Sequence, residues 1–282
     1  MRALALLALL VAAPAAGKGR PKPPPEPAIQ LFDEPAAALR QLLLRRPRVV
    51  AFGEYHETTA GPKLPSAIHR FTEGLLPPLP PTASDLVVET WVTDGKCGGQ
   101  EQQAVAEVAK TTERPATTED EVVTLLKRAK ARQIQPHILT LSCAEYQELQ
   151  ASQAEGLDYA VLLRLIGDKL RQQAIRLLGR PKDRLIVLYG GALHNDRFPK
   201  KELARFTFGG DLAKRTRNRY LEIDLLVPEY VEANEALRRE PWLRQYQEIA
   251  QPQKTVLVRR GEGSYLLWFP RSPPPTLPPS KP

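Results

Sequence analysis

Three short stretches of the chain are apolar without interruption, and each has the length of a β-strand. They cover residues 49–52, 86–88 and 185–188. A strand that is apolar on both faces is typical of a parallel sheet covered by helices on both sides. Residues 138–141 form a further predicted strand, with three apolar residues and Thr140. Residues 220–227 alternate between apolar and acidic side chains, a period that favours a strand.

The segments between these strands carry apolar residues at helical spacing, so we expect helices there. Thr118 is a suitable N-cap for one of them, because its hydroxyl accepts a hydrogen bond from a free backbone N–H. Strands that alternate with helices predict a mostly parallel sheet with helices on both faces. The predicted helices cover residues 35–46, 65–76, 101–110, 119–132, 143–153 and 158–178.

The last two predicted strands form a hairpin. Residues 254–260 and 264–269 flank Gly261-Glu262-Gly263, and glycine in a short connection favours a tight turn. The predicted fold class is therefore α/β: a mostly parallel sheet with helices on both faces and a C-terminal antiparallel hairpin. We expect it to form one domain over residues 31–270.

The first residues have the composition of a secretory signal peptide. Arg2 precedes an apolar run over residues 3–13, and Ala13-Pro14-Ala15 places small residues at a cleavage site. A membrane-spanning helix needs about 20 apolar residues, which this run does not reach. We therefore expect a signal peptide over residues 1–16 and an exported protein, periplasmic or extracellular, with an uncleaved N-terminal anchor as the alternative.

The two ends of the predicted domain are rich in proline, and the chain as a whole is basic. Residues 17–30 form a predicted proline-rich spacer, and residues 271–282 a disordered proline-rich tail, because neither can bury a core. The formal net charge is +8, but the basic residues are mixed with acids along the helices, which favours a solvated surface. We expect a small-molecule or peptide substrate, no nucleic acid and no transmembrane segment. Envelope association and oligomeric state stay open.

The chain has two cysteines, Cys97 and Cys143. An even number in an oxidising compartment suggests one disulfide. Each cysteine follows the carboxyl end of a predicted strand, so the two can bridge if those strands are neighbours. Two free thiols are the alternative.

Polar side chains follow three of the buried strands. Glu54 and His56 follow the first, Glu89 ends the second, and His194 comes soon after the third. In a parallel sheet the carboxyl ends of the strands meet at one edge, where ligands bind. A glutamate buried there must be hydrogen-bonded, paired or bound to a metal. These four residues are the predicted catalytic site.

Two kinds of chemistry fit this set. The histidines act as general bases while the glutamates orient them or carry a proton, or His56, Glu89 and His194 hold a divalent metal that activates water. The structural alternative is that Glu54 or Glu89 only closes the sheet edge, paired with Arg164 or another base.

The motifs Gly53-Glu54-Tyr55-His56, Glu89 and Gly190-Gly191-Ala192-Leu193-His194 resemble those of a superfamily. It joins erythromycin esterases, ChaN-type haem-binding lipoproteins and the TraB/PrgY and Tiki proteins. The resemblance covers about residues 49–196. Asp168 lies where that superfamily often has an acid or amide after an arginine, but Gly167 replaces the arginine here.

The resemblance implies a site but leaves its activity open, because members of one fold differ in chemistry. Tiki-like members imply a metal-dependent protease, esterase members a His/Glu mechanism, and ChaN-like members haem binding. We expect a metal-dependent hydrolase of an ester or amide bond, with a haem- or metal-binding protein without turnover as the alternative. Tyr55 and His69 are the further candidates for binding a cofactor.

Overall fold

A computed structural model of the chain describes residues 28–273 except 92, 113, 116 and 151–157. The predicted signal peptide lies outside the described residues, as do most of the spacer, most of the tail and the end of the helix predicted over 143–153. Within the described part of the chain, no helix is long and apolar enough to cross a membrane.

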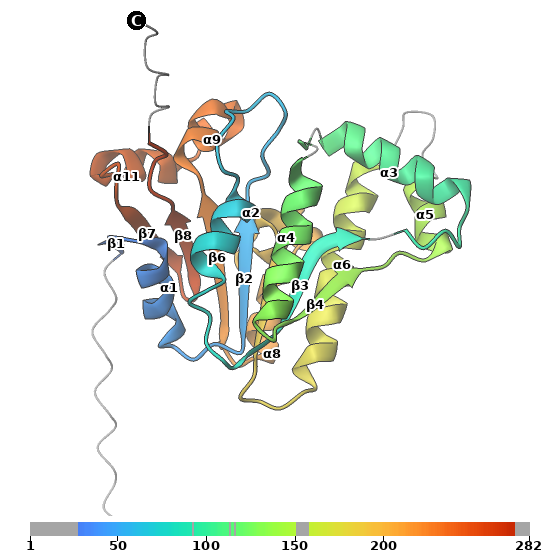
Figure 1. Cartoon of the computed structure of the whole chain (residues 1–282), viewed down its shortest axis with the longest axis horizontal. Coiled ribbons are helices and arrows are strands. Elements are labelled where there is room, and N and C mark those ends of the chain that lie inside the picture. Colours follow the sequence, from blue (N-terminus) through green and yellow to red (C-terminus); the bar gives the residue numbers. More distant parts are fainter. Residues whose placement is uncertain (1–27, 92, 113, 116, 151–157, 274–282) are drawn as a thin grey trace, which may run out of the picture.

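One sheet of eight strands runs through the molecule in the order β1-β7-β8-β6-β2-β5-β3-β4 (Figure 1). The five pairings from β8 to β4 are parallel, whereas β7 is antiparallel to both β1 and β8. The predicted α/β class with its C-terminal hairpin is confirmed. The strands are β1 (Ile29–Phe32), β2 (Val49–Glu54), β3 (Ala83–Trp91), β4 (Gln135–Leu139), β5 (Leu185–Gly191), β6 (Tyr220–Leu226), β7 (Thr255–Gly261) and β8 (Ser264–Trp268).

The C-terminal hairpin does not form the outer edge of the sheet. Strand β8 lies inside the sheet against β6, and the outermost strand is β1, which pairs with β7. The sequence pattern did not predict β1, because it has only four residues and follows a proline-rich stretch. The pairing covers the free edge that β7 would otherwise expose.

Helices cover both faces of the sheet, as predicted (Figure 1). On one face, α1 (Pro35–Leu43), α2 (Ala67–Arg70), the π-helical turn η1 (Phe71–Leu75) and α4 (Thr117–Ala131) pack on β2, β3 and β5. On the other face lie α5 (Cys143–Gln150), α6 (Tyr159–Leu178) and α8 (Gly209–Arg215). The remaining elements are α3 (Gly99–Thr112), α7 (Ala192–Asn195), the 3-10 helix η2 (Lys201–Phe206), α9 (Pro228–Ala233), α10 (Glu235–Arg238) and α11 (Pro241–Ile249).

Strand β2 shows why the continuous apolar runs are central strands. All six of its residues are buried. Val50 and Phe52 belong to the core on the α1 and α4 side, whereas Val49 and Ala51 belong to the core on the α6 side. Alternate side chains of a strand point to opposite faces, so both faces of β2 must be apolar.

Strand β6 buries acids that its alternating sequence does not reveal as buried. Glu222 is 0% and Asp224 is 1% exposed. Arg260 of β7 donates to Glu222 and lies 3.4 Å from Asp224 Oδ2. Burial raises the pKa of Asp224 well above its ordinary value, and the charge of Glu222 raises it further. Both sets of alternating side chains of β6 are therefore buried: the apolar ones lie in the core, and the acidic ones lie near Arg260.

Cys97 and Cys143 form a disulfide, which confirms the predicted pairing. Cys97 lies between β3 and α3, and Cys143 is the first residue of α5. The two strands that precede them, β3 and β4, are neighbours in the sheet. The disulfide therefore ties the amino-terminal region of α3 to α5 beside the carboxyl ends of the strands.

We expect the Cys97→Ser, Cys143→Ser double variant to lower the free energy of unfolding by about 2–4 kcal/mol, since the bridge closes a long loop in the unfolded chain. Urea unfolding of the oxidised wild type and the variant measures the difference. Reduction of the wild type should reproduce the loss and leave the variant unchanged. Equal stability of the variant and the oxidised wild type would contradict the prediction.

Candidate active site

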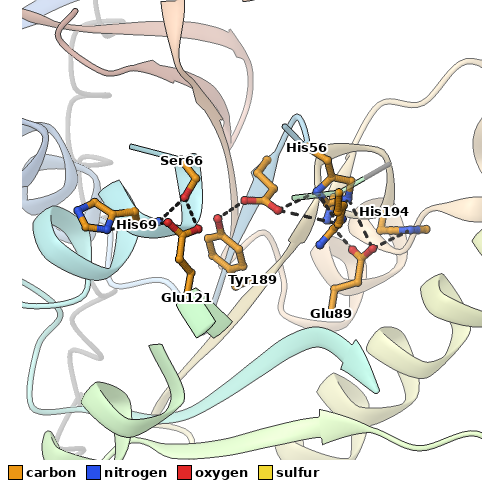
Figure 2. A network of polar contacts seen from close by, with 10 residues as sticks. His56, Ser66, His69, Glu89, Glu121, Tyr189 and His194 are labelled. Atoms are coloured by element: carbon orange, nitrogen blue, oxygen red, sulfur yellow. Dashed lines mark hydrogen bonds and ion pairs between the residues drawn. The ribbon is translucent and has the colours of Figure 1, made fainter. Parts of the chain in front are cut away.

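Four elements bring the predicted site residues to one end of the sheet. Glu54 is the last residue of β2 and His56 follows it, Glu89 lies near the end of β3, and His194 lies in the short helix α7 that directly follows β5. Since β2, β5 and β3 are adjacent and parallel, their carboxyl ends meet. Figure 2 shows His56, Glu89 and His194 pointing toward one another.

Glu54 holds His56 through its buried carboxylate. The side chain of Glu54 is 8% exposed, and its Oε1 lies 2.7 Å from His56 Nδ1. A carboxylate only accepts, so Nδ1 of His56 carries the proton of this hydrogen bond. The buried hydroxyl of Tyr189, on β5, donates to Oε2 of the same carboxylate. With Nδ1 so occupied, Nε2 is the nitrogen of His56 that faces Glu89.

Glu89 is the point at which the two histidines converge. Its Oε1 lies 3.8 Å from Nε2 of His56 and 3.8 Å from Nε2 of His194. Its Oε2 accepts a hydrogen bond from the backbone N–H of Gly191, at 2.5 Å. One carboxylate oxygen is thus anchored on β5, and the other faces the imidazoles.

His194 is fixed by the backbone. Its Nδ1 lies 2.9 Å from the carbonyl oxygen of Phe206, which can only accept, so Nδ1 donates and Nε2 faces Glu89. Gly167 of α6 makes this contact possible, because a Cβ there would lie 2.6 Å from the Phe206 oxygen. Position 167 is therefore a packing position against Phe206 and His194 in this chain.

Two glycines give the side chains of Glu89 and His56 their space. A Cβ on Gly190 would lie 2.8 Å from Cβ of Glu89 and even closer to its carboxylate. A Cβ on Gly191 would lie 3.0 Å from Nε2 of His56. Glycine is required at the end of β5 because the side chains of Glu89 and His56 approach the backbone closely there, as the Gly-Gly sequence suggests.

Arg114 is a further site residue that the sequence analysis did not identify. It lies in the connection between α3 and α4, and its Nη2 is 2.5 Å from both ring nitrogens of His56 and 3.9 Å from Glu54 Oε1. Arg164, the base considered as a partner for the glutamates, instead pairs with Glu148 and Asp168. No local pattern marks Arg114, because only the folding of two helices brings it to the site.

The charges of the site change the pKa values of its members. Burial works against the charged form of Glu89, but the charges of His194, His56 and Arg114 and a hydrogen bond with His56 outweigh it and lower its pKa to about 2. The pKa of Glu54 is also lowered, since His56 and Arg114 outweigh burial. The pKa of His56 is raised, because the two carboxylates outweigh burial and the charge of Arg114.

A cavity of about 360 Å³ opens onto these groups. Its volume is in the range of small-molecule sites. Glu54, His56, Glu89, His194 and Arg114 form its polar side. Most of the remaining lining is apolar and includes Trp91, Val105, Tyr159, Leu162, Leu163 and Ile166.

The two residues predicted to bind a cofactor are in different places. Tyr55 lines the cavity, and its ring also packs 6.0 Å from that of Trp242. His69 lies outside the residues that line it, with Nδ1 4.0 Å from Glu121, whose carboxylate accepts from Ser66. Tyr189 separates this second cluster from His56 in Figure 2. The serine hydroxyl is directed to a carboxylate and not to the histidine, so Ser66 is not an activated nucleophile.

The predicted metal set of His56, Glu89 and His194 does not fit a metal ion as arranged. Among the described residues, no group of three or more His, Cys, Asp or Glu side chains is placed to hold one. The guanidinium of Arg114 lies against both nitrogens of His56, where its charge opposes a cation. We therefore derive the chemistry of the site from the side chains alone.

We expect Glu89→Gln to flatten the acid limb of the stability profile. The folded pKa of about 2 is below the ordinary 4.5, so ionised Glu89 stabilises the fold above pH 4.5, and this contribution is lost as pH falls from 4.5 toward 2. The wild type should exceed the variant by about 2–3 kcal/mol at pH 6 and by little near pH 2.

Urea unfolding at several pH values measures this, and Glu248→Gln, at an exposed position on α11, is the control. A difference between wild type and Glu89→Gln that is independent of pH would contradict the lowered pKa.

No protein-family model and no curated protein sequence matches the chain. Among solved structures, it is similar to the erythromycin esterase EreC in its open conformation, with a TM-score of 0.45 and 10% identity over 83% of this chain and 93% of that chain. It is also similar to the type III effector HopBA1, with a TM-score of 0.40 and 12% identity over 88% of this chain and 100% of that chain. Likenesses at this level carry no information on activity or substrate.

Proposed function

We propose that the chain is a hydrolase of an ester or amide bond that uses a His/Glu mechanism at the cavity described above. The observation that carries the proposal is the convergence of two imidazole Nε2 atoms on one carboxylate oxygen, at 3.8 Å each, beside an arginine and an apolar wall. Holding proton acceptors, a cation and an apolar surface together is costly for a fold, and it suits acyl transfer to water.

His56 is the proposed general base. In the proposed reaction Arg114 turns from Nε2 of His56, where it lies at 2.5 Å, toward the carbonyl oxygen of the substrate. Glu54 holds the Nδ1–H of His56, so the freed Nε2 takes a proton from water as the water oxygen attacks the carbonyl carbon of the substrate. The carbonyl oxygen becomes an oxyanion, which the guanidinium of Arg114 stabilises by charge. When the tetrahedral intermediate collapses, the bond from carbon to the leaving oxygen or nitrogen breaks, and His56 returns the proton to the leaving group.

Glu89 and His194 position the reacting water in this proposal. Glu89 stays ionised because of its lowered pKa, and it accepts a hydrogen bond from the water. His194 presents Nε2 to the same space, since Nδ1 is bound to the backbone. The apolar wall of the cavity suits an aliphatic or aromatic acyl group.

We expect the purified protein to hydrolyse p-nitrophenyl butyrate, and His56→Ala to lower kcat by about 10²–10⁴, which is the usual contribution of a general base. His69→Ala is the matched control, because it removes a histidine that lies outside the cavity, and it should leave kcat unchanged. Activity should survive EDTA. Loss of activity to EDTA with restoration by a divalent ion would support the metal-dependent alternative. The proposal fails if no ester or amide in a panel is cleaved.

A general base must be neutral, so we expect kcat to increase with pH through the pKa of His56. The midpoint of this increase should lie above pH 6.5, because the pKa of His56 is raised from its ordinary value of 6.5. Glu54→Gln removes a carboxylate that raises this pKa, so the rising limb should move to lower pH while kcat falls about tenfold or more. Glu121→Gln, next to His69, should leave the limb in place. An unmoved limb in Glu54→Gln would exclude His56 as the titrating base.

A further inference from the structure

A second cavity lies at the opposite end of the sheet and has a volume of about 600 Å³. Arg48 precedes β2, Arg219 precedes β6, and Lys182 lies in the connection from α6 to β5. Strands β6, β2 and β5 are neighbours at the centre of the sheet, so their amino ends bring these three side chains together. Helix α8, whose end also lines the cavity, lies at the lower end of the sheet in Figure 1.

The lining of this cavity carries charge of one sign. Five of its nine residues are cationic and none is acidic: Arg48, Lys182, Arg215, Arg217 and Arg219. Arg215 pairs with Asp211 on α8. Within the described residues, the other four form no ion pair with a carboxylate within 4.0 Å. Side chains that repel one another are held around one hollow, which favours an anion inside it.

Arg48 is the deepest of these cations and is 4% exposed. It donates hydrogen bonds to the backbone oxygens of Arg180, at 2.8 Å, and Arg184. These carbonyls satisfy its hydrogen bonds but carry no full negative charge. Burial and the charge of Arg219 lower its pKa, and they outweigh the charges of Asp183 and Asp85, which raise it. A buried guanidinium whose acids are not in direct contact is costly, and an anion in the cavity would offset that cost.

The backbone around the cavity is held in conformations that side chains rarely adopt. Arg217 has a φ of 53° and Arg46 a φ of 50°, both in the left-handed region. The Nε of Arg219 donates to the carbonyl oxygen of Arg46 at 3.0 Å and joins the two turns. An arginine costs more than glycine or asparagine in this region, and such positions are frequent at ligand sites.

We propose that this cavity binds a small molecule that carries two or more phosphate groups. Arginine forks match phosphate oxygens in pairs, and several cations suit several charges. The volume is that of a small-molecule site, and a hollow of this size fits a compact anion better than a flat membrane or a nucleic-acid duplex. Ile175 and Leu178 give the cavity a partly apolar wall for the organic part of the ligand. The proposal is independent of the activity proposed for the other end of the sheet.

Calorimetric titration of the full chain with sodium tripolyphosphate at low ionic strength tests the proposal. We expect saturable binding to one site. The Lys182→Ala, Arg217→Ala double variant should bind at least about tenfold more weakly, because it removes two cations that would donate hydrogen bonds to phosphate oxygens. Both substituted positions are exposed, so the fold should be retained, as thermal unfolding will check.

Arg244→Ala is the matched control, because it removes an exposed cation on α11, away from the cavity. It should bind tripolyphosphate as the wild type does. Equal weakening in Arg244→Ala and the double variant would mean binding by net charge alone and would overturn the proposal, as would absence of binding by the wild type.

A second titration distinguishes a free phosphate compound from a lipid headgroup. Vesicles of phosphatidylcholine with about 10% phosphatidylinositol bisphosphate, whose headgroup basic clusters recognise, serve as the probe. Binding of both probes, with the double variant weaker for each, supports the site and assigns the headgroup as a source. Binding of tripolyphosphate alone supports a soluble ligand. Binding of vesicles alone, unaffected by the double variant, contradicts the cavity as the site.

Discussion

The carboxylates of Glu54 and Glu89 lie at the ends of two central strands with little exposure to water, and burial of a charge must be compensated. For Glu54, the compensation comes from His56, Tyr189 and the charge of Arg114. For Glu89, it comes from the Gly191 N–H and from two imidazoles. The partners come from several elements, so this one requirement fixes the end of β5, the turn after β2 and the connection between α3 and α4.

The compensation also explains why the site is prepared for proton transfer. A carboxylate that is stabilised by imidazoles raises their affinity for protons in return, since the interaction is mutual. His56 consequently has a raised pKa while Glu89 has a lowered one. The contacts that compensate the buried acids therefore also give the two groups different roles: Glu89 stays ionised, whereas His56 exchanges protons.

Much of the architecture was accessible from the sequence, because local patterns carry it. The apolar runs predicted β2, β3 and β5, and the strand-end position of Glu54, His56, Glu89 and His194 placed them at one edge. Arg114 was missed because its position depends on how α3 and α4 fold back, which no neighbouring residue encodes. Strand β1 was missed because it is short, and the burial of Glu222 and Asp224 because their partner Arg260 lies in the later strand β7.

The relation between Gly190 and Glu89 has a consequence for how this protein can change in evolution. The carboxylate of Glu89 fills the volume in which a side chain at position 190 would lie. A mutation that adds a side chain at position 190 first must displace the acid, whereas a mutation that shortens position 89 first opens room for it. The order of substitutions is thus constrained, and among homologous chains the two positions should vary together, with glycine retained wherever the glutamate is retained.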